Sequence, residues 1–160
     1  MSNEQPWFHP TAIIESSDIG HGTKVWAFSH VCSGASIGSD CVIGEGVHIG
    51  KNVIIGDRVK IQNSALIYEG VCIEDDVFIG PGVVTTNDIY PRSQGEWSNR
   101  FMTTSIRKGA SIGANSTIVC GNTIGQNSMV GAGSVVVNDV PDSTTVVGNP
   151  AKAIARIREV

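Results

Sequence analysis

The chain has few charged and few aromatic residues for its length. Charged side chains make up 16% of the 160 residues and aromatic ones 6%, and the formal net charge is −4. A basic surface for nucleic acid or an anionic membrane is therefore not predicted. The sequence also lacks an apolar run near the ~18 residues of a membrane span, and a basic start followed by an apolar segment, as in a signal peptide. We expect a soluble protein located in the cytoplasm.

Paired cysteines are missing as well. The four cysteines, Cys32, Cys41, Cys72 and Cys120, form no CxxC pair and no short metal-ligand spacing. We expect reduced, structural thiols rather than a disulfide framework.

What the chain has in abundance is a repeat of six residues. From Ile13 to Ile79 every sixth residue is isoleucine or valine, and the spacing resumes at Ile106 and runs to Val136. A second series, mostly small residues or valine, falls two positions before the next aliphatic residue, so both members point to one side of a short strand. A helix with 3.6 residues per turn cannot keep a six-residue spacing on one face.

Short strands joined by turns at this spacing predict an all-β, single-domain parallel β-helix. Three units make one triangular coil, so the eighteen units give about six coils. Glycine often follows the aliphatic position, as at Gly38 and Gly44, and we expect the turns there. The predicted segments are an N-terminal cap closed by Trp7 and Phe8 (1–12), coils (13–84), an extended loop (85–105), further coils (106–141) and a tail with a short C-terminal helix (142–160).

The loop over residues 85–105 is the one interruption of the repeat. It opens with two threonines, Asn87 and Asp88, and it contains no histidine. A β-helix of identical coils has flat faces and offers no pocket, whereas loops on a rigid scaffold carry function. A loop of this length inside a compact array is more often functional than structureless. We therefore predict the active site at this loop.

Two histidines, His30 and His48, lie one coil apart in outward positions and should stack on one face. Zinc requires at least three good ligands, and the same ladder continues to Leu66 and Val84, which cannot bind a metal. No metal site is predicted. A place in a substrate groove or an interface is favoured over metal binding, and a plain surface pair is the alternative. Neither histidine has a carboxylate beside it in the sequence, and the sequence leaves open whether one of them acts as a base.

The repeat followed by VVGNPAK resembles the hexapeptide-repeat acyltransferases that use acetyl-CoA, whose β-helix is left-handed. That resemblance implies a homotrimer in which the pantetheine arm of the coenzyme lies in a groove between two subunits. Outward apolar residues at Ile54, Cys72, Val42 and Phe78 are in keeping with subunit contacts. The coenzyme contacts implied by the resemblance are Gly113, Ala114, Ala132, Asn149, Pro150, Lys152 and Arg156.

A closer resemblance covers IGDRVKIQNSALIYEGVCIEDDVFIGP, then TND, YPRS and KGASIGANSTIVCGNTIG. These stretches are similar to N-acetyltransferases of nucleotide-linked amino sugars for bacterial surface polysaccharides, which acetylate a 3-amino group. NDIYPRS looks more like the enzymes for dTDP-3-amino-3,6-dideoxyhexoses than those for UDP-2-acetamido-3-amino-2,3-dideoxyglucuronate. The resemblance implies that Asn87 lies at the reacting centre and that the coenzyme sulfur takes up the proton. The expected substrate contacts are Asn63, Tyr68, Asp88, Tyr90, Arg92 and, from the histidine pair, His48.

Other interpretations remain open at this point. The same fold serves zinc enzymes of the γ-class carbonic anhydrase type, acetyltransferases for other small amines or hydroxyls, and non-catalytic scaffolds. Simpler roles also exist for individual residues: Asn63 in a turn, Arg92 in a pair with Asp88 or Glu96, and Lys152 in solvent.

Overall fold

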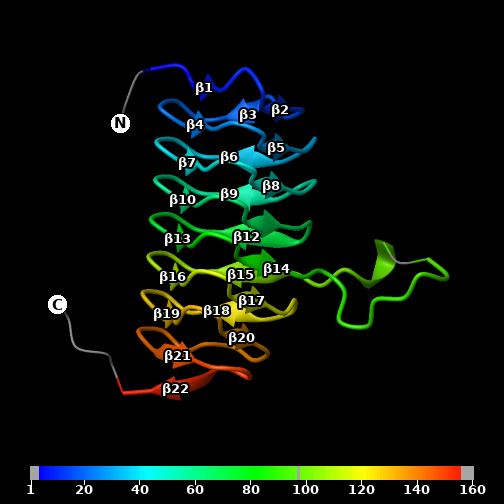
Figure 1. Cartoon of the computed structure of the whole chain (residues 1–160), viewed down its shortest axis with the longest axis vertical. Helices are drawn as coiled ribbons and strands as arrows, with labels where there is room; N and C mark the ends of the chain where they lie inside the picture. The colour runs from blue at the N-terminus through cyan, green and yellow to red at the C-terminus, as the bar shows by residue number, and fades with distance from the viewer. Residues whose placement is uncertain (1–3, 97, 156–160) are drawn as a thin grey trace.

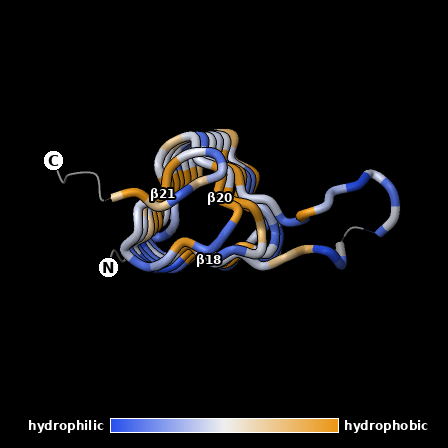
Figure 2. The backbone as a smooth tube through the Cα atoms, turned by 90° about the horizontal axis from the view of Figure 1, so that it is seen from below, coloured by the Kyte–Doolittle hydropathy of each residue, from blue (hydrophilic) through white to orange (hydrophobic). Residues whose placement is uncertain are grey.

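The chain folds as a parallel β-helix in the computed structural model, which describes residues 4–96 and 98–155. Figure 1 shows the coils stacked along one axis, with a long loop leaving the stack between β14 (Val84–Thr85) and β15 (Thr104–Ile106). Viewed along the axis, the coils superimpose and the loop projects from one corner (Figure 2). The predicted all-β architecture is confirmed.

Three sheets form the walls, and each complete coil contributes one short strand to each wall. Sheet A holds β1 (Trp7–Phe8), β4 (Lys24–Val25), β7 (Val42–Ile43), β10 (Lys60–Ile61), β13 (Phe78–Ile79), β16 (Ser111–Ile112), β19 (Met129–Val130), β21 (Thr145–Val147) and β22 (Lys152–Ile154). Sheet B holds β2 (Ile13–Ile14), β5 (His30–Val31), β8 (His48–Ile49), β11 (Leu66–Ile67), β14, β17 (Thr117–Ile118) and β20 (Val135–Val136). Sheet C holds β3 (Asp18–Ile19), β6 (Ser36–Ile37), β9 (Ile54–Ile55), β12 (Val71–Ile73), β15 and β18 (Thr123–Ile124).

The stack is longer than the six coils predicted. Sheet C has six strands, so six turns have a strand in every wall. Beyond them, β19, β20 and β21 add parts of two further turns, and Val140 replaces a strand by bridging to Ile124. The chain thus makes about eight turns, as the eight parallel strands of sheet A indicate. The count from the sequence fell short because it began after β1, passed over Thr85 and ended where the six-residue spacing is lost near Pro141, although Val146 still pairs with Val130.

Both ends differ from the prediction. Lys152–Ile154 form β22, which runs antiparallel to β21, so the predicted C-terminal helix is wrong for these residues; residues 156–160 lie outside those described. At the other end, the structure makes Trp7 and Phe8 part of the coil stack. They form β1 and pair with Lys24 and Val25, which adds a strand to sheet A.

The core is the column of inward-facing aliphatic residues. From Val25 to Val136 these residues are 2% exposed or less. Several of the small positions carry a hydroxyl that bonds to the backbone, as when Ser29 Oγ donates to the Gly44 carbonyl at 2.6 Å. The first coil departs from the predicted register. Ile14, not Ile13, pairs with Val31, and Ile13 is 58% exposed because the corner between β2 and β3 is one residue shorter than the next ones. All four cysteines are free thiols.

Two kinds of residue shape the corners, and the prediction identified only one. The backbone is left-handed once in most corners, at glycines such as Gly34 (φ 75°), at Asn or Asp, such as Asn52 (φ 56°), and at Phe28, Arg58, Ser64 and Ser143. The glycine after the aliphatic residue, where we expected the turn, has another purpose. A Cβ on Gly38 would lie 2.6 Å from the Gly56 carbonyl carbon of the next coil, so this glycine permits the close approach of successive coils.

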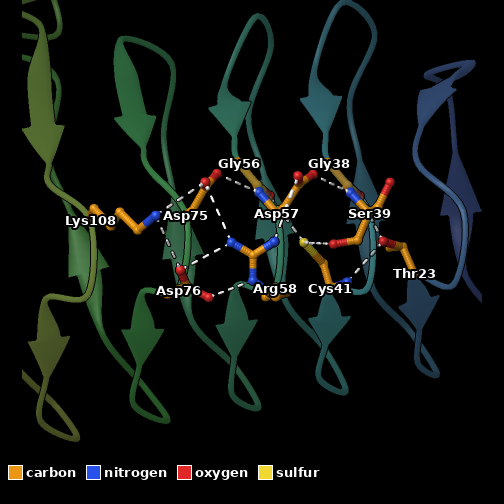
Figure 3. Close-up of polar contacts among 10 residues, drawn as sticks. All are labelled: Thr23, Gly38, Ser39, Cys41, Gly56, Asp57, Arg58, Asp75, Asp76 and Lys108. Atoms are coloured by element: carbon orange, nitrogen blue, oxygen red, sulfur yellow. Dashed lines mark hydrogen bonds and ion pairs between the residues drawn. The ribbon is translucent and has the colours of Figure 1, made fainter. Parts of the chain in front are cut away.

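Charged residues close the corner between sheets C and A. Asp57 accepts the Ser39 N–H at 2.7 Å and Asp75 accepts the Asp57 N–H at 3.0 Å, so each carboxylate joins one coil to the previous one. Arg58 lies among these carboxylates and donates from Nε to Asp76 at 2.6 Å, as Figure 3 shows. This arginine lowers the pKa of Asp76. The corner is thus a scaffold element on the far side of sheet C from the long loop.

The long loop is slightly shorter than predicted. Thr85 belongs to β14, where it pairs with Ile118 and is fully buried, and Thr104 begins β15 by pairing with Val71. Thr85 stands where the repeat otherwise has an aliphatic residue. Its hydroxyl can be buried there because it accepts the Tyr68 N–H at 2.9 Å. The loop therefore spans residues 86–103 rather than 85–105, and we call it the arm.

The core ladder makes a testable prediction within one strand. Ile55 is 2% exposed and its neighbour Ile54 is 55% exposed. Ile55→Ala should lower the free energy of unfolding by about 2–5 kcal/mol, because a cavity opens between the coils above and below. Ile54→Ala should change it by less than about 0.5 kcal/mol. Chemical denaturation of both variants checks this, and equal losses would contradict the assignment of inward and outward faces.

Candidate active site

A pocket lies between the arm and the edge where sheet B passes into sheet C. It has a volume of about 490 Å³. The coil corners form its floor and the arm covers it. Its lining residues are Cys32, His48, Gly50, Lys51, Tyr68, Glu69, Asn87, Asp88, Pro91, Arg92 and Phe101.

The floor follows from the coil register. His30 pairs with His48 across β5 and β8, and their rings meet edge to face with centroids 5.5 Å apart. The His48 ring lies 5.6 Å from that of Tyr68, which follows β11. The predicted stacking of the two histidines is confirmed. The structure adds a carboxylate that the local sequence did not reveal, because Glu15 of the coil before bonds to His30 at 3.0 Å.

Burial decides the protonation of this floor. It lowers the pKa of His48, and the neighbouring His30 adds to the shift. Burial raises the pKa of the Cys32 thiol, and the negative charge of Glu15 raises it further. The hydrogen bond with His30 lowers the pKa of Glu15. At neutral pH the pocket therefore presents a neutral imidazole and an un-ionised thiol, so Cys32 is poorly suited to act as a nucleophile.

The arm supplies the roof through its first residues. The Asn87 carbonyl accepts the Met102 N–H at 2.9 Å, which joins the two limbs of the arm close to the coil stack. Asp88 Oδ1 accepts the Tyr90 N–H at 2.8 Å, which makes a local turn before Pro91 and Arg92, two further lining residues. Thr86 Oγ1 accepts the Cys120 N–H at 3.0 Å and so ties the root of the arm to the next coil.

Five of the substrate-site residues predicted from the sequence line this pocket: His48, Tyr68, Asn87, Asp88 and Arg92. Two do not. Tyr90 is 72% exposed and is absent from the lining. Asn63 lies on another edge, between sheets A and B, where its Oδ1 accepts the Glu45 N–H at 3.1 Å. Within one chain, Asn63 therefore has a structural role, as a hydrogen-bond acceptor in a turn between coils.

The sequence reasoning missed several lining residues although a signal was present. Gly50 and Cys32 lie one and two coils before Tyr68 at the same corner, and Lys51 lies one coil before Glu69. The repeat length alone, counted back from Tyr68 and Glu69, would have found them. Phe101 could not be found this way because it belongs to the arm.

The predicted coenzyme residues lie elsewhere on the molecule. Gly113 and Ala114 form the corner between β16 and β17, Ala132 lies one coil on, and the Ala114 carbonyl accepts the Gly133 N–H at 2.8 Å. This is the edge between sheets A and B, so sheet B separates these residues from the pocket. Asn149 and Pro150, joined by a cis peptide bond, and the exposed Lys152 follow β21. Arg156 lies outside the described residues.

A group of potential metal ligands occurs in the pocket floor. The ligand atoms of His30, Cys32 and His48 lie within 4.8 Å of one another. The sequence suggested only two ligands, because the outward ladder of His30 and His48 continues to Leu66 and Val84. Cys32 was not counted because it lies in the corner after β5 and not in a strand. Here the Cys32 thiol lies 3.7 Å from His30 Nε2, the nitrogen that also bonds to Glu15.

Comparison with known families agrees with the six-residue repeat. A model described as "Bacterial transferase hexapeptide (six repeats)" matches residues 16–51 and 52–87, and one described as "Hexapeptide repeat of succinyl-transferase" matches 104–137. Most of the arm falls between these matches. A β-helix of these units defines a transferase of the hexapeptide-repeat class.

Individual relatives narrow the class. A dTDP-3-amino-3,6-dideoxy-alpha-D-galactopyranose 3-N-acetyltransferase of Aneurinibacillus thermoaerophilus is 60% identical over 151 residues, which cover 94% of this chain and 78% of that protein. The chain belongs to the hexapeptide-repeat acetyltransferase family, and the resemblance inferred from its sequence is confirmed.

Solved structures share the fold. A hexapeptide-repeat acetyltransferase of Vibrio cholerae, complexed with acetyl coenzyme A, matches with a TM-score of 0.67 and 29% identity over 79% of this chain and 72% of its own. PerB of Caulobacter crescentus, in complex with CoA and GDP-perosamine, matches with a TM-score of 0.58 and 25% identity over 92% of this chain. The present chain spans 56% of the PerB chain, a little over half. Over the part of the chain that the structure describes, helical segments are too short or too polar to cross a membrane.

The environment of His48 makes a prediction about pH. Its folded-state pKa is lowered from 6.5, so below about pH 6.5 the unfolded chain binds a proton that the folded chain does not yet bind. The free energy of unfolding should therefore decrease as the pH falls from 6.5 through the folded-state pKa, and NMR titration should give a midpoint below 6.5 for the His48 ring. His48→Gln should remove this part of the pH dependence. A midpoint at or above 6.5 would contradict the buried, neutral ring.

Proposed function

We propose that the protein transfers the acetyl group of acetyl-CoA to the 3-amino group of a nucleotide-linked amino sugar, with a dTDP-3-amino-3,6-dideoxyhexose as acceptor. The observation that carries this proposal is the 60% identity to the 3-N-acetyltransferase, whose 151 aligned residues leave only a few of this chain's 160 outside and so include the arm. The pocket under that arm supports it, because the lining combines two cations, Lys51 and Arg92, with polar groups suited to a sugar.

The reaction does not need a strong protein base. A neutral amine attacks the thioester carbonyl, the new C–N bond forms, the C–S bond breaks, and the thiolate of CoA takes the proton that the nitrogen releases. What the site must do is orient the amine and stabilise the tetrahedral intermediate. The Asn87 amide suits this role at the mouth of the arm, and the neutral His48 ring can accept a hydrogen bond from the amine.

Such a transfer requires no metal, because a thiolate is already a good leaving group. The group of His30, Cys32 and His48 is the feature that favours the alternative of a zinc enzyme of the carbonic anhydrase type. One zinc per chain in the purified protein, lost together with activity on chelation, would decide for that alternative.

We infer that the active unit is a homotrimer with the site between subunits. The proposed coenzyme residues Gly113, Ala114 and Ala132 lie on one edge of sheet B and the pocket lies on the other, so a second copy is needed to bring the acetyl group to the acceptor. Asn63 and the nucleotide-binding tail from Asn149 to Arg156 would act across the same interface. The outward positions of sheet B support such a contact because they carry no Lys, Arg, Asp or Glu: Ile13, His30, His48, Leu66, Val84, Thr117 and Val135.

The acceptor assignment further implies a place in the cell. Nucleotide sugars and acetyl-CoA are both made in the cytoplasm, so we propose that the enzyme acts there, in the synthesis of a bacterial surface polysaccharide. Tyr68, Asp88 and Arg92 would contact the sugar nucleotide from this chain, and the exposed Tyr90 would do so as the arm closes.

The proposed reaction is tested by thiol release from acetyl-CoA in the presence of dTDP-, UDP- and GDP-linked amino sugars. The fastest release is expected with a dTDP-linked 3-amino-3,6-dideoxyhexose, with one acetamide formed per thiol. Release with a simple alcohol or small amine but with none of the nucleotide sugars would refute the proposal.

The role of Asn87 is tested by a pair of substitutions within the arm. Asn87→Ala should lower kcat by roughly 10²–10³-fold, as the loss of one donor to a tetrahedral intermediate does in other enzymes. The affinity for acetyl-CoA, measured by calorimetry, should stay unchanged. Asn99→Ala, an exposed asparagine of the same arm, is the matched control and should leave kcat as it is. Unchanged turnover in Asn87→Ala would remove this residue from the mechanism.

A further inference from the structure

One arginine joins the two limbs of the arm, in addition to the backbone bond between Asn87 and Met102. Residues Ser98–Arg100 form a 3-10 helix on the returning limb. From there the Arg100 guanidinium reaches back, so that Nε lies 3.6 Å from Asp88 Oδ2 and Nη1 donates to the Tyr90 carbonyl at 3.4 Å. Asp88 and Tyr90 both belong to the outgoing limb.

This ion pair is shielded from water, unlike the others of the chain that the structure describes. The Asp88 side chain is 10% exposed and that of Arg100 33%, whereas the pair of Arg107 with Glu74 is 52% and 41% exposed. A shielded pair is screened little by salt and so holds its partners more firmly than an exposed one.

The Arg100 guanidinium is also incompletely bonded. Its Nε and Nη2 atoms are buried and have no hydrogen-bond partner among the described residues. Buried donors without an acceptor are costly, and shortening the Nε to Asp88 distance by a few tenths of an ångström would turn the ion pair into a hydrogen bond. A small movement of the returning limb toward Asp88, as the pocket fills, would therefore be favourable.

We propose that Arg100 is a positioning residue for the acetyl transfer, acting through Asp88 to hold Asn87 over the pocket. Asn87 precedes Asp88 directly and its carbonyl bonds to the Met102 N–H, two residues after Arg100. The ion pair and this backbone bond thus close a small ring at the base of the arm, and Asn87 in this ring lines the pocket. The expected effect of Arg100 on turnover rests on the proposed function. Its expected effect on the conformational order of the arm rests on the geometry of the arm alone.

The test uses three variants of the full chain and two measurements. Arg100→Gln removes the charge, Arg100→Lys keeps it, and Arg107→Gln breaks an exposed pair outside the arm as the matched control. Hydrogen exchange of the Met102 amide reports on the closed ring and needs no substrate. Steady-state kinetics with the nucleotide amino sugar separate kcat from the KM for acetyl-CoA.

We expect Arg100→Gln to speed exchange at Met102 at least about tenfold and to lower kcat by up to roughly 10²-fold, as misplacement of a reacting group by about 1 Å does. The KM for acetyl-CoA and the exchange of the coil amides should not change. Arg100→Lys should recover part of both effects, and Arg107→Gln should match the unaltered protein.

Normal exchange and normal kcat in Arg100→Gln would overturn the proposal, as would faster exchange throughout the coils, which would mean a loss of general stability. If no nucleotide amino sugar is acetylated by the unaltered protein, the proposed function fails. The exchange result then decides by itself whether Arg100 orders the arm.

Discussion

The whole molecule depends on one constraint, the backbone hydrogen bonds that join each coil to the next with a fixed offset along the chain. Lys60 pairs with Val42 on one side and with Phe78 on the other, and the same offset holds through most of sheet A. Because the offset is constant, each side chain stacks on its counterpart in the next coil. The aliphatic core, the left-handed corners and the glycines that allow close approach all follow from it.

The candidate active site lies where this constraint is released. The coils before and after the arm keep their pairing, since Val71 of β12 meets Thr104 of β15 directly. The arm can therefore leave the stack without disturbing it, and Thr86, Asn87 and Asp88 are held at the point of departure by bonds to both the coils and the returning limb. Rigid coils supply the floor of the pocket and the arm supplies its roof, so precision and access come from different parts of the fold.

The sequence allowed the fold to be predicted, together with the loop that covers the pocket, because a period of six is visible without any contact information. Features that depend on a single shift or on a distant partner were not visible. A corner one residue short exchanges Ile13 for Ile14, Glu15 reaches His30 from another coil, and Lys152–Ile154 form a strand because β21 offers an open edge. Asn63 was grouped with the site by resemblance, but its edge of the prism is separated from the pocket by sheet B.

The central claim, that the coils bind the coenzyme and the arm creates the acceptor site, is tested most directly by removing the arm. Replacing residues 86–103 by the three-residue corner that Tyr68–Gly70 form one turn earlier should leave the coil stack intact, because β14 and β15 keep their partners. Calorimetry of this shortened chain should still detect acetyl-CoA and should no longer detect a dTDP-linked amino sugar. Undiminished binding of the sugar nucleotide would contradict the account.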